Sequence, residues 1–212
     1  MAADWGTISE LSTAGGTLVL AIATFASVRS ANRAARSAER SLLANIRPLL
    51  LTSAPDDREQ KIGFADNHWV RLGGSRGAAE IADEAIYFTM SLRNVGNGIA
   101  VLHGWVVIPE RVQGDVPHTD IDTFHRLTRD IYVPPDDVGF WQGALREPTD
   151  PEFVAARKGI DSGEPLTVYL LYGDLEGGQR TISRFAMQPM KEGGQYFCTV
   201  ARHWNIDRAD PR

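Results

Sequence analysis

Imidazole side chains can bind metals or transfer protons near neutral pH, and the chain has five histidines. Three of them lie next to or near a tryptophan, in the pairs His68–Trp69, His103–Trp105 and His203–Trp204. If the fold brought these pairs together, they would form an aromatic pocket with titratable edges. However, adjacent residues of a strand point to opposite faces of a sheet. The alternative is therefore that each tryptophan fills the core while its histidine faces solvent or a loop.

No pattern in the sequence indicates catalysis. The histidines show no recognised metal-ligand spacing with one another or with the single cysteine, Cys198. No phosphate-binding loop and no Gly-x-Ser-x-Gly motif occurs. Asp174 and Glu176 lie in a glycine-rich turn, where solvated carboxylates are more common than an acid–base pair. We therefore predict no catalytic residue, no metal ligand and no cofactor, and a protein that is not an enzyme.

The elements that would position any site begin with an 18-residue stretch, 11–28, that has no charged residue. As a helix it would be about 27 Å long, close to the roughly 30 Å hydrocarbon core of a bilayer. We therefore predict a transmembrane helix. A secretory signal peptide is one alternative, but residues 1–10 contain Asp4 and Glu10 and no basic residue. A helix buried in a soluble oligomer is the other.

A basic stripe follows this stretch. Its residues repeat at helical spacing and end just before Pro48: Arg29, Arg33, Arg36, Arg40 and Arg47. We predict that the stripe contacts the headgroups of the lipid bilayer, or else that it acts only as a topology signal on a solvated face. Small residues four apart within 11–28, such as Thr17 and Ala21, would permit helix pairing and hence a homo-oligomer.

The excess of arginine on one side of the stretch predicts its orientation in the cell membrane. The N-terminus is expected outside and the C-terminal domain in the cytoplasm, and a lone cysteine gives no reason to expect an oxidising compartment. The predicted organisation is a short extracytoplasmic segment, a single-pass transmembrane helix, a basic juxtamembrane helix and a cytoplasmic domain, at residues 1–10, 11–28, 29–47 and 48–212.

Charge separates the two parts of the chain. The whole chain carries a net charge of −5, and residues 1–47 carry five arginines against three acidic residues. The remaining 165 residues therefore carry −7, enough chain for one domain with a full core. Because phosphate neutralisation dominates affinity for nucleic acids, an acidic domain of this kind predicts that no nucleic acid is bound.

The domain has the sequence pattern of a mainly β fold. In residues 85–95, apolar Ile86, Phe88, Met90 and Leu92 alternate with Tyr87, Thr89, Ser91 and Arg93, which predicts a half-buried antiparallel strand. Further strands are predicted at 47–53, 61–72, 99–109, 126–133, 138–145, 166–172, 180–187 and 195–204, with a helix at 151–160 and loops near 54–60 and 73–84. These elements predict an antiparallel β-sandwich, for which immunoglobulin-like layering is one arrangement.

The N-terminal stretches 17–25, 27–33 and 47–50 and the turn 92–98 resemble a group of uncharacterised bacterial single-pass membrane proteins. The turn 172–177 is similar to a tyrosine–acid–glycine hairpin in many bacterial membrane-anchored β domains. The members of this group have an N-terminal transmembrane helix, an Arg-rich juxtamembrane helix and a small β-sandwich domain. The resemblance implies this architecture for the chain. It implies no activity, because the motifs that carry it are structural.

Two functions remain open at this point. The first is a membrane-anchored module that uses its β domain for protein interaction or scaffolding with an unknown protein partner. The second is a membrane-bound enzyme or small-ligand sensor with a pocket among the tryptophan–histidine pairs. An open sheet edge would favour the first function, and a concave cluster of these pairs would favour the second.

Overall fold

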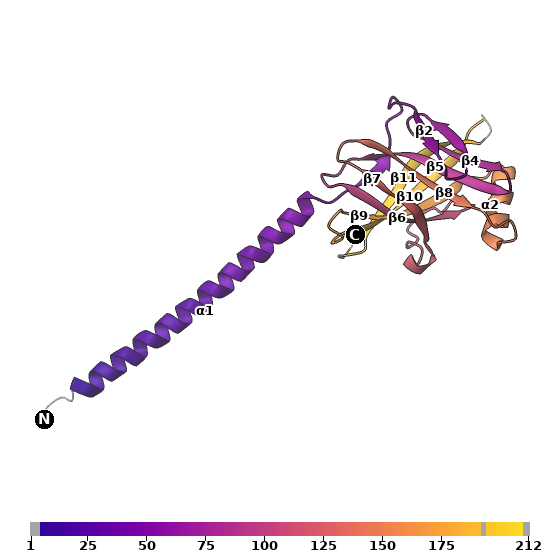
Figure 1. Cartoon of the computed structure of the whole chain (residues 1–212). Coiled ribbons are helices and arrows are strands. Elements are labelled where there is room, and N and C mark those ends of the chain that lie inside the picture. The colour runs from indigo at the N-terminus through magenta and orange to yellow at the C-terminus, as the bar shows by residue number, and fades with distance from the viewer. Residues whose placement is uncertain (1–4, 192–193, 210–212) are drawn as a thin grey trace. The chain divides into compact units, whose positions relative to one another are not determined.

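The computed structural model describes the backbone of residues 5–191 and 194–209, and their side chains except at 5–14 and 44. The chain divides into two compact units, Met1–Ala44 and Asn45–Arg212. The first unit consists of most of the helix α1, Trp5–Asn45. The second is a β domain (Figure 1). Residues 1–4 of the predicted extracytoplasmic segment lie outside the described residues, and residues 5–10 belong to α1.

All side chains of α1 from residue 15 to residue 42 are exposed. No other described part of the first unit therefore packs against this stretch of the helix. Within the described residues, no helix combines the length and the apolar character that a membrane crossing requires. The transmembrane span predicted at 11–28 is therefore not supported. Its composition gives a physical reason, since seven of its 18 residues are glycine, serine or threonine and dilute the apolar side chains.

The β domain is built on one antiparallel sheet of nine strands (Figure 1). The strands are β1 Leu50–Thr52, β4 Arg76–Ala82, β5 Ala85–Asn94, β6 Ala100–Ile108, β7 His125–Val133, β8 Val138–Leu145, β9 Leu166–Gly173, β10 Arg180–Pro189 and β11 Gln195–Asn205. Their order is β1-β5-β4-β11-β10-β9-β6-β7, and β8 pairs with β5. A separate hairpin joins β2, Gln60–Gly63, to β3, Trp69–Leu72.

The curl of the sheet follows from its connections. Strands β7 and β8 belong to opposite ends of the sheet, yet only the short segment 134–137 joins them. The sheet must therefore bend until its two ends lie near each other. The predicted mainly β class is confirmed, whereas two separate sandwich layers are not, because hydrogen bonding continues from strand to strand through one curled sheet.

Most strand predictions are confirmed within a few residues, and so is helix α2, Pro151–Asp161, with its N-cap Asp150. Two are wrong. Residues 61–72 form β2 and β3 rather than one strand. Strand β4 occupies a segment that was expected to be a loop. The prediction missed this strand because its small residues hide the alternation of apolar and polar side chains. Gly77 lies where a Cβ would be 2.7 Å from the sulfur of Cys198, so this position excludes larger side chains.

The main core lies inside the curl. Its largest fully buried side chains include Phe88, Trp141, Tyr172 and Phe185, contributed by β5, β8, β9 and β10. Helix α2 adds Phe153 to the same core. Side chains from strands far apart in the sequence therefore meet in one apolar interior, and their burial drives the folding of the domain.

Both faces of β5 are buried. The prediction that only one face of this strand is buried is therefore wrong. The β2–β3 hairpin packs Ile62, Val70 and Leu72 against Tyr87 on the face that was expected to meet solvent. Thr89 on that face is fully buried, and its hydroxyl donates to the carbonyl of Trp141 at 2.7 Å. A partner hairpin that lies outside the sheet cannot be inferred from the alternation within β5 itself.

A third apolar cluster lies on the outer face of the sheet. Val106, Tyr169, Ile182 and Trp204 are buried there, on β6, β9, β10 and β11. Residues of the segment 109–124, which links β6 to β7 and contains the short helix η1, Ile121–Thr123, pack against them. This connection therefore covers an apolar face rather than forming a free loop.

Asn94, at the end of β5, joins several segments through one fully buried side chain. Its Oδ1 accepts from the amides of Leu49 and Gly96 at 3.1 and 3.0 Å, and its Nδ2 donates to the carbonyls of Gly98 and Val133 at 2.7 and 2.9 Å. These four bonds use the full capacity of the amide. The first strand, the β5–β6 turn and the end of β7 are therefore held at one point.

Replacing Asn94 with alanine should destabilise the protein by about 2–5 kcal/mol, because it leaves four backbone groups without their partner. Urea denaturation of the full chain would measure this loss. The matched control is Asn97→Ala, since Asn97 is exposed in the same turn. If both substitutions lowered the denaturation midpoint equally, the role assigned to Asn94 would be wrong.

Candidate functional site

The first tryptophan–histidine pair lies on the β2–β3 hairpin. The Nε2 atom of His68 lies 2.9 Å from a carboxylate oxygen of Glu80, and its ring stacks on Tyr87 with centroids 4.1 Å apart. Trp69 points away from this contact, is 55% exposed and lies under the ammonium group of Lys61. This pair is therefore part of the hairpin packing.

The second pair is split between the two faces of the sheet. His103 lies at an irregularity in β6 with part of its side chain in solvent. Partial burial of the ring and, second, the charge of Arg180 lower the pKa of its imidazole. Trp105 is 3% exposed and belongs to the main core. His103 and Trp105 therefore do not line one common pocket.

The third pair is also divided. The Nδ1 atom of His203 lies 2.6 Å from the hydroxyl of Ser183, which is in turn 2.9 Å from the hydroxyl of Tyr172. Ser183 is fully buried, so this serine–histidine contact is closed to a substrate. Burial also raises the pKa of Tyr172 to about 12. Trp204 lies in the outer cluster, and the three pairs therefore do not converge on one site.

Four of the five arginines of the predicted lipid-binding stripe lie on α1 and are exposed: Arg29, Arg33, Arg36 and Arg40. Arg47 differs, because its guanidinium bonds to the β domain. It donates to Thr181 and Asn205 at 3.2 and 3.0 Å and forms an ion pair with Asp207 at 2.5 Å. The stripe on the helix is therefore shorter than the sequence spacing predicts.

The pairing of the sheet is interrupted at the seam between β7 and β8. In the described residues, β7 pairs only with β6 and β8 pairs only with β5, so each strand has one unpaired edge. The strands are close near their connecting turn, where a Cβ at Gly139 would lie 2.5 Å from Val133. Further along, β7 bulges, and its residues 127–130 lie opposite the single residue His103 of β6.

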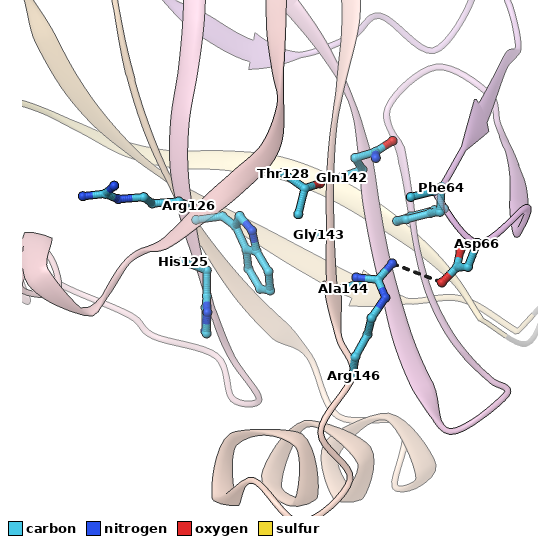
Figure 2. A pocket seen from close by; sticks show the side chains of 11 residues that line it. Phe64, Asp66, His125, Arg126, Thr128, Gln142, Gly143, Ala144 and Arg146 are labelled. Atoms are coloured by element: carbon cyan, nitrogen blue, oxygen red, sulfur yellow. Dashed lines mark hydrogen bonds and ion pairs between the residues drawn. The ribbon is translucent and has the colours of Figure 1, made fainter.

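A cavity of about 390 Å³ lies at the other end of the seam (Figure 2). Its lining comes from the β2–β3 turn, β6, β7 and β8, and includes Phe64, Asp66, Trp105, His125, Arg126, Thr128, Gln142, Gly143, Ala144 and Arg146. Gly143 has no side chain, and a Cβ there would lie 2.7 Å from the indole of Trp105. The indole therefore packs directly against the β8 backbone.

One ion pair and one histidine–carboxylate contact hold the walls of this cavity. The guanidinium of Arg146 lies 3.1 Å from the carboxylate of Asp66 (Figure 2). The same carboxylate also accepts from the hydroxyl of Tyr87 at 2.7 Å. The bond from Tyr87 is the main cause that lowers the pKa of Asp66. Across the cavity, the Nε2 atom of His125 lies 2.7 Å from a carboxylate oxygen of Glu152. Both acidic groups are therefore already engaged.

Arginines predominate around the opening. Arg129 reaches across the seam, donates to the side-chain oxygen of Gln142 at 2.8 Å and lies over the ring of Phe140. Arg126 is exposed and forms no ion pair with any side chain that the structure describes. The guanidinium groups of Arg126 and Arg129 therefore place positive charge beside an unpaired strand edge, while Arg146 is paired with Asp66. Such a site can bind an extended chain that carries acidic groups.

Sequence reasoning did not identify this site. The pattern of 126–133 and 138–145 predicts strands, but it carries no sign that their edges stay unpaired. His125 and Arg126 have no motif around them, and Gln142 and Arg146 look like ordinary surface residues. Among the described residues, no group of three or more His, Cys, Asp or Glu side chains could hold a metal ion.

The fold and the site define a mainly β domain with an open seam, preceded by one long helix. No protein-family model matches the sequence, and no curated protein is similar to it. A solved structure, the X-ray structure of Northeast Structural Genomics Consortium target SoR45, is 12% identical and aligns over 79% of this chain and 88% of that one. Its TM-score of 0.21 is too low to support a conclusion about fold or function.

Asp66 makes the stability of the cavity wall dependent on pH. Its pKa in the folded protein lies below the ordinary 3.8, so its contribution is present above that value and lost as the pH falls through the folded pKa. Asp66→Asn should therefore destabilise the protein at about pH 7 more than at about pH 2.5, in urea denaturation at each pH. Asp56→Asn, at an exposed residue, is the control. A pH-independent effect of Asp66→Asn would contradict the assignment.

Proposed function

We propose that the β domain is a protein-interaction module that binds an extended, acidic segment of a partner protein in the seam between β7 and β8. The observation that carries this proposal is the unpaired edge of β8 beside the cavity. An exposed strand edge presents a row of backbone donors and acceptors, and partner segments bind such edges by adding a strand.

The charged residues around the opening of the cavity, here called the rim, favour the binding of an acidic segment. Arg126 and Arg129 lie along the opening and form no ion pair with the side chains that the structure describes, whereas Arg146 is paired with Asp66 and Glu152 contacts His125. This local positive charge stands out in a domain whose net charge is −7. Backbone pairing with β8 would supply affinity, and the arginines would select for acidic side chains.

The cavity supports an anchor residue within that segment. The indole of Trp105 and the small residues Gly143 and Ala144 offer an apolar surface beside the strand edge. A side chain of the added strand could rest on this surface, as anchors do at the centre of many interfaces. The alternative, a ligand site among the predicted tryptophan–histidine pairs, is less favoured because those pairs lie in separate places.

The helix supports a multivalent arrangement of this module. Leu18, Leu20, Ile22 and Phe25 are each more than 60% exposed on α1, and exposed apolar surface of this extent needs a cover. We propose that a second copy of the helix supplies it, since small residues spaced four apart permit close packing. Two joined domains would bind a divalent partner with higher avidity. The predicted membrane location and orientation remain predictions.

A peptide-display selection with the full chain tests the proposed binding site. The selected sequences should be rich in Asp and Glu. A selected peptide should slow hydrogen exchange at backbone amides of β8, because strand addition pairs the open edge. Slowed exchange in other strands with none in β8 would contradict strand addition.

Arg126→Glu should weaken the selected peptide at least about tenfold, because it reverses a charge at the rim. Binding would be measured by isothermal titration calorimetry. Arg58→Glu makes the same change at an exposed position outside the cavity lining and should have little effect. Equal weakening by both variants would indicate only long-range electrostatics.

Leu20→Arg should shift the full chain from dimer to monomer, because it places a charge in the proposed helix–helix contact. Light scattering after size-exclusion chromatography measures the mass in solution. Ser30→Arg introduces the same side chain at another exposed position of α1 and should leave the dimer intact. A monomeric wild type that sediments with lipid vesicles would show that lipid, rather than a second copy, covers the helix.

A further inference from the structure

Two arginines are cross-strand neighbours on the sheet. Arg184 of β10 and Arg202 of β11 are directly paired in the register. Like charges in this position repel each other. Their guanidinium carbons lie 5.4 and 5.0 Å from the ring centre of Trp204. Arg202 forms an ion pair with Asp115, whereas Arg184 forms none with any residue that the structure describes.

Arg184 is an anomaly among the buried groups of the domain. It is only 4% exposed, and its Nη2 donates to the carbonyl of Gly114 at 2.9 Å. Its Nε and Nη1 atoms are buried and have no hydrogen-bond partner. A buried charge normally has a counter-charge, and buried donors normally have acceptors. The ring of Trp204 satisfies neither need fully, because it offers no acceptor atom to Nε or Nη1.

The segment that covers Arg184 can give access to it. Residues 113–117 are exposed, and Gly114 has a positive φ of 75° with open space around its Cβ position. On its N-terminal side the segment is tied down by Thr167, whose hydroxyl donates to the carbonyl of Glu110 and accepts from the amide of Val112. A displacement limited to the tip would release the carbonyl of Gly114 from Arg184 and the carboxylate of Asp115 from Arg202, and would uncover Arg184 while the Thr167 bonds stay in place.

We propose that Arg184 is the centre of a binding site for a small oxyanion with the chemistry of inorganic phosphate, beneath the tip of the segment 109–124. The anion accepts hydrogen bonds from Nε and Nη1 and neutralises the charge that Arg184 and Arg202 concentrate there. Guanidinium binds such oxygens through several donors at once. This site lies outside the cavity lining between β7 and β8 and is independent of the proposed interaction function.

The experiment uses the full chain with inorganic phosphate as the probe. Thermal unfolding is followed at rising phosphate concentration, with sodium chloride at the same ionic strength as the reference. A site of this kind should give a saturable rise in Tm with phosphate and a smaller, non-saturating change with chloride. Arg184→Met removes the donors at similar volume and should abolish the phosphate response. Arg180→Met, at an exposed position of the same strand, should retain it.

A second measurement covers the case in which Arg184→Met does not fold. The arginine Nε–H resonances of the wild type, labelled with nitrogen-15, are followed by NMR during the same titration, and Arg184→Lys assigns the resonance of interest. A saturable shift of that resonance supports the site. An equal rise in Tm with chloride, a phosphate response that survives in Arg184→Met, or an unchanged Arg184 resonance would overturn the proposal.

Discussion

The amide of Asn94 is the interaction on which the arrangement of the β domain depends. It satisfies the backbone of the first strand, of the β5–β6 turn and of the end of β7 at once. The backbone of Asn94 also bonds to Asp136 and Asp137 in the β7–β8 connection. The two edge strands of the curled sheet, β7 and β8, are thereby held together near their connecting turn. Further along, the described residues show no β7–β8 ladder, and the side chains of Arg129 and Gln142 bridge the seam beside the cavity.

The parts that could be predicted from the sequence are those in which a local pattern sets the structure. The alternation from Ile86 to Leu92 places one face of β5 in the core, as the structure has it. The glycine and asparagine residues after Asn94 predict a turn, but not that the Asn94 side chain is buried and fully bonded. Strand β4 was missed because Gly77, Ala78 and Ala79 are small and show no alternation of large apolar side chains. At Gly77 the reason is packing, since a Cβ there would lie 2.7 Å from side-chain atoms of Met187 in β10 and Cys198 in β11.

The candidate site depends entirely on long-range contacts, and no sequence pattern could have found it. Its residues come from the β2–β3 turn, β6, β7 and β8, and their common feature is that two strand edges stay apart. The tryptophan–histidine pairs show the opposite case. Proximity in sequence suggested a site. Residues two apart in a regular strand share a face, but the register of β6 shifts between Leu102 and Gly104, so Trp105 lies in the core while His103 stays outside.

The entry of the chain into the domain has a mechanical consequence. Immediately after α1, Arg47 is fastened to β10, β11 and Asp207, and Leu49 is fastened to Asn94. Tension applied through the helix would load these two attachments before it reached the apolar interior. Side-chain hydrogen bonds and one ion pair, rather than the core, would then set the force at which the first strand peels away.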